Sequence, residues 1–159
     1  MKNLVKMLLI LLLALPVVAD ESSTIVGKIL KDILQNHHFR KLPMDDKLSK
    51  KAFDEYIKAV DYSKHFLYES EVKDLKKKYQ KKFDDQIQSG KITIASDTLG
   101  IVQKRVDLLQ KWREEFFKKK FDYKVKETIE LEAKKRDFAS NEKELKNRWR
   151  KIFKQSVLS

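Results

Sequence analysis

A serine and a lysine stand three positions apart in the run Ser70-Glu71-Val72-Lys73. In some serine acyl-transfer enzymes this Ser-x-x-Lys spacing lets a lysine amine activate the serine hydroxyl for attack on a carbonyl carbon. Such enzymes also carry companion motifs on a large mixed fold, and this sequence has neither. The same spacing is typical of a helix that begins at a serine and continues with an exposed lysine, and we expect that arrangement here.

The three histidines, His37, His38 and His65, are the other residues with catalytic or metal-binding potential. A zinc site needs three or four converging ligands, and adjacent histidines seldom both point inward. The chain has no cysteine, which excludes disulfides, thiolate metal sites and cysteine nucleophiles. We therefore expect the histidines to lie in connectors, and we predict no metal, no cofactor and no catalytic residue.

The first 19 residues have the pattern of a secretory signal peptide. Lys2 and Lys6 precede an apolar run over residues 7–15, and small residues end at Ala19. We predict cleavage after Ala19, which leaves residues 20–159 as an exported, periplasmic domain. An uncleaved membrane anchor is the alternative, and the short apolar run disfavours it.

Positive charge dominates the chain, with 36 Lys and Arg against 24 Asp and Glu and a net charge of +12. The runs Lys76–Lys78 and Lys118–Lys120 are basic enough to contact phosphates. Because acidic residues are interleaved with or precede these runs, solvated helix faces are the better interpretation. We expect no nucleic-acid partner, since export removes most nucleic acid from reach. Lipid head groups at a membrane surface, or acidic proteins, remain conceivable partners.

The elements that position these residues are predicted to be helices, because the chain has only three glycines and two prolines. On a helix at 100° per residue, the apolar residues of the stretch 93–120 cover about half of the circumference. So wide an arc needs several neighbours. It predicts an all-α, irregular multi-helix domain packed around this long central helix. The predicted core residues of the helix are Val102, Val106, Leu109, Trp112 and Phe116.

Two arginines, Arg105 and Arg113, fall inside the same apolar arc. Their stems would cover apolar surface while the guanidinium groups reach water or a carboxylate. Alternatively, a partly buried ion pair would fix the arrangement of the helices. The sequence leaves both arrangements open.

Apolar periodicity and capping residues place the other helices. They are predicted up to about Asn36, from Asp45 or Asp46 to Val60, from Ser70 to a stop at Gly90, and from Ser140 or Asn141 onward, with a weaker helix or irregular stretch before the last. The stripe of the last helix reaches the final residues without a stop signal. We expect this helix to continue in a longer relative, and its exposed stripe to favour self-association.

The connectors between these helices resemble those of tail-specific proteases, also called C-terminal processing peptidases. One stretch is similar to the family's His-Tyr-x-x-x-x-Leu-Asp-Asp-x-Leu-Ser, a second to its Leu-Asp-x-x-x-x-x-Phe-Leu, and two more to its Phe-Asp-Phe and Trp-Arg-Lys. The residues that carry the resemblance are His38, Phe39, Asp45, Asp46, Leu48, Asp61, Phe66, Leu67, Phe121, Asp122, Tyr123, Trp149 and Arg150. Tyr62 departs from the family, which usually has proline there.

The resemblance implies the N-terminal helical domain of such a protease, over residues 20–159. Proteins of this family continue into a PDZ domain and a protease core with a serine–lysine dyad, and this sequence contains neither. No catalytic residue can therefore be carried over, and we expect no activity from this chain alone. The implied role is a scaffold and protein-contact surface in a truncated or split protease. Its implied partners are the catalytic part, an adaptor or a substrate protein.

A free-standing basic helical chaperone of the periplasm is the alternative function. A small exported chain with a high pI and no cysteine suits such a protein. The long uninterrupted helical arms of such a chaperone do not suit a chain that is broken at Pro43, Asp61, Gly90 and Asp122.

Overall fold

The computed structural model describes residues 21–38 and 43–158, with side chains from Ile25 onward. Within this part, six α-helices are joined by turns and irregular segments. Their bounds are α2 Glu21–Asp32, α3 Asp46–Val60, α4 Glu69–Tyr79, α5 Phe83–Ser89, α6 Thr93–Lys119 and α7 Glu142–Leu158. A π-helical turn, Ile33–His37, follows α2, and a 3-10 turn, Ala133–Lys135, precedes α7. The predicted all-α class is confirmed.

The described residues contain no strand, and a single isolated bridge joins Tyr68 to Ala139. None of the described helices combines the length and the apolarity that crossing a bilayer requires. The predictions for residues 1–19 and for Phe39 lie outside the described residues.

The chain divides into two compact units. Unit 1 comprises the described residues up to Val60 together with residues 74–98, and unit 2 comprises residues 61–73 and the described residues from Leu99 onward. The boundaries fall inside α4 and α6, so each of these helices contributes to both units. The two units are therefore described separately.

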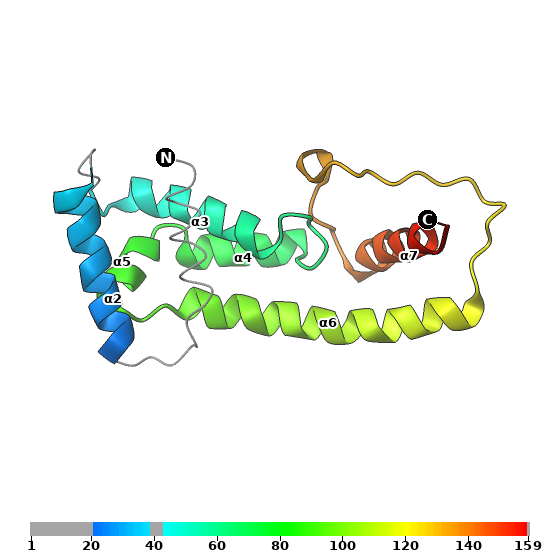
Figure 1. Ribbon diagram of the computed structural model, residues 1–159, viewed down its shortest axis with the longest axis horizontal. Coiled ribbons are helices and arrows are strands. Elements are labelled where there is room, and N and C mark those ends of the chain that lie inside the picture. The colour runs from blue at the N-terminus through cyan, green and yellow to red at the C-terminus, as the bar shows by residue number, and fades with distance from the viewer. Residues whose placement is uncertain (1–20, 39–42, 159) are drawn as a thin grey trace. The chain divides into compact units, whose positions relative to one another are not determined.

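Unit 1 contains α2, α3 and α5 with parts of α4 and α6 (Figure 1), and its buried apolar side chains come from all five of these helices. Its buried residues include Leu30, Phe53, Tyr56, Ile57, Leu75, Tyr79, Phe83, Ile87 and Ile94. Gly27 marks the closest approach, because a Cβ built there would lie 1.9 Å from the carbonyl oxygen of Ile87. The glycine thus lets the backbones of α2 and α5 meet directly.

The predicted single helix from Ser70 to Gly90 is wrong, because the chain leaves the helix after Tyr79 and resumes at Phe83. Ser49 on α3 stabilises the break from outside. Its hydroxyl donates to the carbonyl of Gln80 at 2.8 Å and accepts from the amide of Phe83 at 2.8 Å. These bonds satisfy backbone groups that a continuous helix would pair internally.

The start of α4 also differs from the predicted N-cap at Ser70. The helix begins at Glu69, and the side chain of Glu71 accepts the amide of Tyr68 at 2.7 Å. A glutamate inside the first turn therefore caps this helix by reaching back, as in a capping box.

Three other predicted helix ends are confirmed. Asp45 accepts the amide of Leu48 at 2.8 Å and caps α3, and Asn141 accepts the amide of Glu144 at 3.0 Å and caps α7. Gly90 closes α5 in the left-handed region at φ 71°. Each end depends on a side chain or a glycine within a few positions of the helix, which is why the sequence predicts it.

The long helix predicted over 93–120 is confirmed as α6. Of its predicted core residues, Trp112 and Phe116 are buried, whereas Val102, Val106 and Leu109 are half-buried. In unit 2 the later part of α6 lies alongside α7 (Figure 1). Trp112 and Phe116 form a core there with Ala139 and Leu145, and Leu109, Trp149 and Phe153 pack against it.

Candidate functional site

The connector 61–68, which precedes α4 in unit 2, has the densest polar network around it. Asp61 is only 3% exposed. One of its carboxylate oxygens accepts the amide of His65 at 2.8 Å, and the other accepts the amides of Phe66 and Leu67, both at 2.9 Å. One side chain thus binds three consecutive backbone N–H groups, as an anion does in a backbone nest. Three of the predicted family residues, Asp61, Phe66 and Leu67, meet in this turn.

The carbonyl groups of the same connector point to donors from other elements. Each of four consecutive carbonyls accepts a hydrogen bond from an arginine or tryptophan side chain: Ser63 from Arg136, Lys64 from Arg148 at 2.5 Å, His65 from Trp149 at 2.8 Å and Phe66 from Arg105 at 2.7 Å. These donors come from α6, α7 and the segment between them. The connector therefore ties three elements of unit 2 together through its backbone.

The surroundings of Arg105 show which of the two arrangements that the sequence left open for the arginines it adopts. Arg105 is 4% exposed, pairs with Glu71 at 2.6 Å and lies 3.7 Å from the ring centroid of Tyr68. The partly buried ion pair is therefore the observed arrangement for Arg105, whereas Arg113 is exposed. Such a pair fixes geometry more than it stabilises the fold, since both charges lose water.

His65 lies between Arg136 and Trp149. Its Nε2 is 2.7 Å from the Arg136 guanidinium, and the imidazole and indole ring centroids are 5.2 Å apart. Burial and the positive charge of Arg136 lower the pKa of His65 to about 4. The imidazole is therefore neutral at pH 7 and accepts a hydrogen bond from Arg136, so it serves as a structural acceptor.

The residues with catalytic or metal-binding potential are not assembled into a reactive site within the described residues. Ser70 is exposed, and Lys73 forms an ion pair with Glu69 at 2.7 Å instead of contacting Ser70. His37 pairs with Asp32 at 3.3 Å. No group of three His, Cys, Asp or Glu side chains in the described part of the chain is placed to hold a metal ion.

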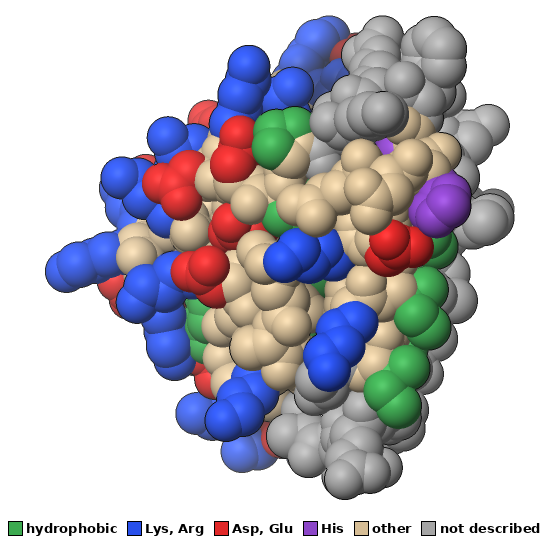
Figure 2. Space-filling view, turned by 90° about the vertical axis from the view of Figure 1, so that its left-hand side faces the viewer, with side chains coloured by type: hydrophobic (Ala, Val, Ile, Leu, Met, Phe, Trp, Pro, Cys, Tyr) green, Lys and Arg blue, Asp and Glu red, His purple; other side chains and the backbone are tan. Residues whose placement is uncertain are grey.

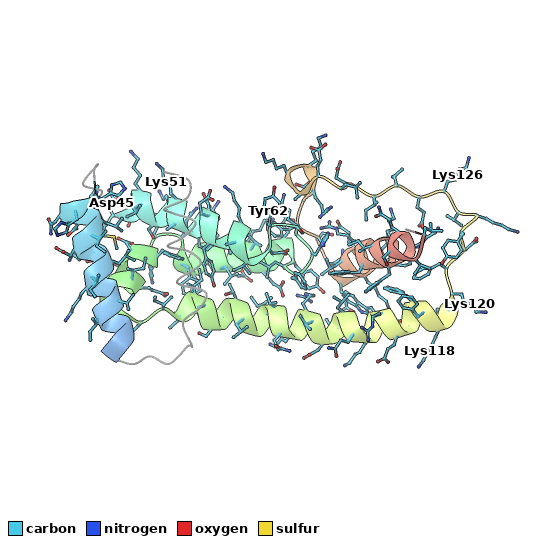
Figure 3. The ribbon with its side chains drawn as sticks, viewed as in Figure 1. Asp45, Lys51, Tyr62, Lys118, Lys120 and Lys126 are labelled. Atoms are coloured by element: carbon cyan, nitrogen blue, oxygen red, sulfur yellow. The ribbon has the colours of Figure 1, made fainter. Side chains whose placement is uncertain are left out.

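The remaining family residues fall into separate places. His38, Asp45, Asp46 and Leu48 lie in unit 1, around the start of α3. In unit 2, the rings of Phe121 and Tyr123 contact each other at a tilt, with centroids 6.3 Å apart. The side chain of Asp122 accepts the amide of Lys124 at 2.9 Å, and Arg150 pairs with Glu127. Tyr62, where the family usually has proline, is an exposed turn residue (Figure 3).

Sequence reasoning did not identify Arg136 and Arg148, which donate hydrogen bonds to two of the connector carbonyls. Arg136 comes from an irregular segment and Arg148 from a helix rich in basic residues, so no local pattern marks either. The sequence singled out Arg105 only because it interrupts an apolar arc. A charge on an otherwise apolar helix face is the one available signal for such a residue.

Comparison with known proteins identifies the family of the chain. A family model described as "Tail specific protease N-terminal domain" matches residues 30–159. The chain belongs to this family. The tail-specific protease of Haemophilus influenzae is 25% identical over 147 residues, which cover 92% of this chain and 21% of that protein. The chain thus spans about a fifth of the length of that curated relative. The resemblance seen in the connectors is confirmed.

Proposed function

We propose that this chain serves as the non-catalytic N-terminal helical domain of an exported tail-specific, C-terminal processing serine protease. Its role is that of a periplasmic scaffold and protein-contact surface. The observation that carries the proposal is the network around the connector 61–68. The ionisable side chains of this network are already occupied by structural hydrogen bonds. Asp61 and Arg105 bind backbone groups of the connector, and the His65 imidazole binds the Arg136 guanidinium.

A row of isoleucines on α2 and the π-helical turn that follows it is the surface that we assign to protein contact. Ile25, Ile29 and Ile33 recur every fourth residue and are 44–55% exposed, while Gly27 and Leu30 face the core of unit 1. In the view of Figure 2, hydrophobic side chains follow one another along the right-hand edge of the molecule. We assign the row to the remainder of the protease chain, because the matched relative is about five times as long as this domain.

Replacing the matching segment of the Haemophilus influenzae protease with this chain tests the proposal. We expect the chimera to cleave an unfolded protein substrate, and a version without the segment to lose that activity. Substituting serine at Ile25, Ile29 and Ile33 should lower the activity of the chimera at least tenfold. Lys28→Ser, an exposed change on the same helix, should leave it unchanged.

Two results would overturn the proposal. One is an inactive chimera whose domain is folded by circular dichroism. The other is cleavage of the unfolded substrate by this chain alone, lost in Ser70→Ala, because the hydrolase interpretation would then hold.

A further inference from the structure

The segment between α6 and the 3-10 turn contains residues 126–132, which we call the extended stretch. No bend or turn interrupts it, and no strand of the described residues pairs with it. The backbone of Glu132, at its end, is extended, with φ −78° and ψ 110°. In Figure 1 the stretch is part of the open trace that leads back to the 3-10 turn. Long connections without secondary structure are uncommon in compact domains, and many of them bind a partner.

One edge of the extended stretch is held by other residues of unit 2. Successive residues of an extended chain direct their backbone groups to opposite edges. On the even-numbered edge, the carbonyl of Thr128 accepts from Lys151 on α7 at 3.0 Å, and the carbonyl of Glu130 accepts from Arg136. On the odd-numbered edge, three residues have amides and carbonyls without a hydrogen-bond partner in the described part of the chain: Glu127, Ile129 and Leu131.

The odd-numbered edge is accessible to another chain. Glu127 is an exposed residue although its side chain is only 20% exposed, so much of its exposure comes from the backbone. Leu131 is 68% exposed, and Ile129 is half-buried. Unpaired amides and carbonyls along an exposed edge are a template for pairing with a further strand.

The extended stretch is complementary to itself in one antiparallel register. When two copies pair about Ile129, that residue faces its own counterpart and Glu127 faces Leu131 of the second copy. These are the residues with unpaired amides and carbonyls, so each opposed pair can exchange two hydrogen bonds without breaking an existing one. At both ends of the pairing, Lys126 faces Glu132 of the second copy, which places opposite charges across the strands.

The charged residues are available for these contacts. Lys126 forms no ion pair within the described residues and extends away from the helices (Figure 3). Glu132 pairs with Lys135 at 2.6 Å, but both side chains are 63% exposed, and such an ion pair contributes little. Moving the register by two residues would bring in Val125, whose carbonyl already accepts from Lys154 at 3.0 Å. We propose that the extended stretch pairs with that of a second copy, antiparallel about Ile129, in a two-fold dimer.

The size of the interface sets the expected affinity. Two short stretches bury little area, so we expect a weak dimer whose population rises with concentration. The two-fold axis repeats the contact between Lys126 and Glu132, so each dimer contains it twice. Reversing one of these charges replaces two attractive contacts by two repulsive ones. We expect the dissociation constant of the dimer to rise about tenfold or more.

Sedimentation equilibrium of charge variants tests the register. The chain is used without residues 1–19, whose apolar run would itself associate; every contact described above is made within residues 21–158. We expect the wild type to dimerise between about 10 μM and 1 mM, at about 0.15 M salt to screen the net charge. Lys126→Glu and Glu132→Lys should each weaken the dimer. An equimolar mixture of the two variants should restore it, because every reversed charge then meets its opposite.

The backbone pairing has a separate readout. Hydrogen exchange followed by NMR should show slower exchange at high concentration for the amides of the odd-numbered edge, whereas the amides of Thr128 and Glu130 should be unchanged. Ile129→Pro removes an amide of the pairing edge and should weaken the dimer. Its matched control, Thr128→Pro, removes an amide of the opposite edge and should keep the dissociation constant within about threefold. Lys143→Glu, an exposed change outside the stretch, controls for net charge and should also keep it.

Circular dichroism confirms that each variant is folded. A wild type that stays monomeric at about 1 mM would overturn the inference. A dimer that the mixture of Lys126→Glu and Glu132→Lys does not restore would show that the register is wrong. A dimer with unchanged affinity in all variants would place self-association on another surface. Protease activity is not measured, so none of these results bears on the proposed function.

Discussion

Asp61→Asn is the most direct test of the connector network. The native carboxylate, 3% exposed, accepts three backbone amides, two on one oxygen and one on the other. Asparagine keeps one oxygen, which can retain the amides of Phe66 and Leu67 as weaker, neutral hydrogen bonds. Its NH₂ group then faces the amide of His65, donor against donor.

The expected loss follows from these three contacts. A hydrogen bond to a charged group contributes about 1.5–3 kcal/mol, and a neutral one about 0.5–1.5 kcal/mol. An unsatisfied buried donor costs about 1–3 kcal/mol. One lost bond of about 1.5–3 kcal/mol and two bonds weakened by about 1–1.5 kcal/mol each therefore predict a loss of about 3.5–6 kcal/mol in the free energy of unfolding. That is a large fraction of the stability of an ordinary domain.

Urea denaturation followed by circular dichroism measures this loss, with the midpoint and the slope compared between variants. Asp45→Asn is the matched control, because its carboxylate accepts a single amide at the start of α3 and asparagine caps a helix equally well. The control should stay within about 0.5 kcal/mol of the wild type. If Asp61→Asn were no more destabilising than Asp45→Asn, the connector would not hold unit 2 as argued.

Three further changes test separate parts of the structure. The pKa of His65 is lowered to about 4 from its ordinary value of 6.5, so the unfolded chain takes up the proton first as the pH falls. The contribution of His65 to the free energy of unfolding is fully present above pH 6.5 and is lost as the pH falls from 6.5 to 4. After allowance for the partial exposure of the ring, this loss should be about 1–2 kcal/mol. Urea denaturation at several pH values measures this dependence of the free energy of unfolding on pH. The dependence should be absent in His65→Gln, and an unchanged dependence in that variant would contradict the assignment. Gly27→Ala should destabilise by more than about 2 kcal/mol, since its Cβ would meet a backbone carbonyl at 1.9 Å. Gly100→Ala meets nothing within 4 Å and should instead stabilise α6 by about 0.5–1 kcal/mol; thermal melting of both variants checks the two signs. Leu109→Ala should cost about 1–3 kcal/mol because the side chain is half-buried against the unit 2 core, whereas Lys111→Ala should stay within about 0.5 kcal/mol. Equal denaturation midpoints for these last two variants would show that the helical phase of α6 is wrong.

Local interactions explain what could be predicted from the sequence. The caps at Asp45 and Asn141, the stop at Gly90 and the extent of α6 depend on residues within a few positions of one another. The family resemblance lies in the connectors for a related reason, because a turn such as that of Asp61 needs particular side chains at fixed short spacings.

Contacts between distant residues decided the rest. The break between α4 and α5 depends on Ser49, which lies 34 positions before the amide of Phe83 that it binds. Arg105 was ambiguous because Phe66 and Glu71, its partners, are 39 and 34 positions away. Helical periodicity gives the direction of a side chain, but only the packed structure determines which carbonyl or carboxylate that side chain meets.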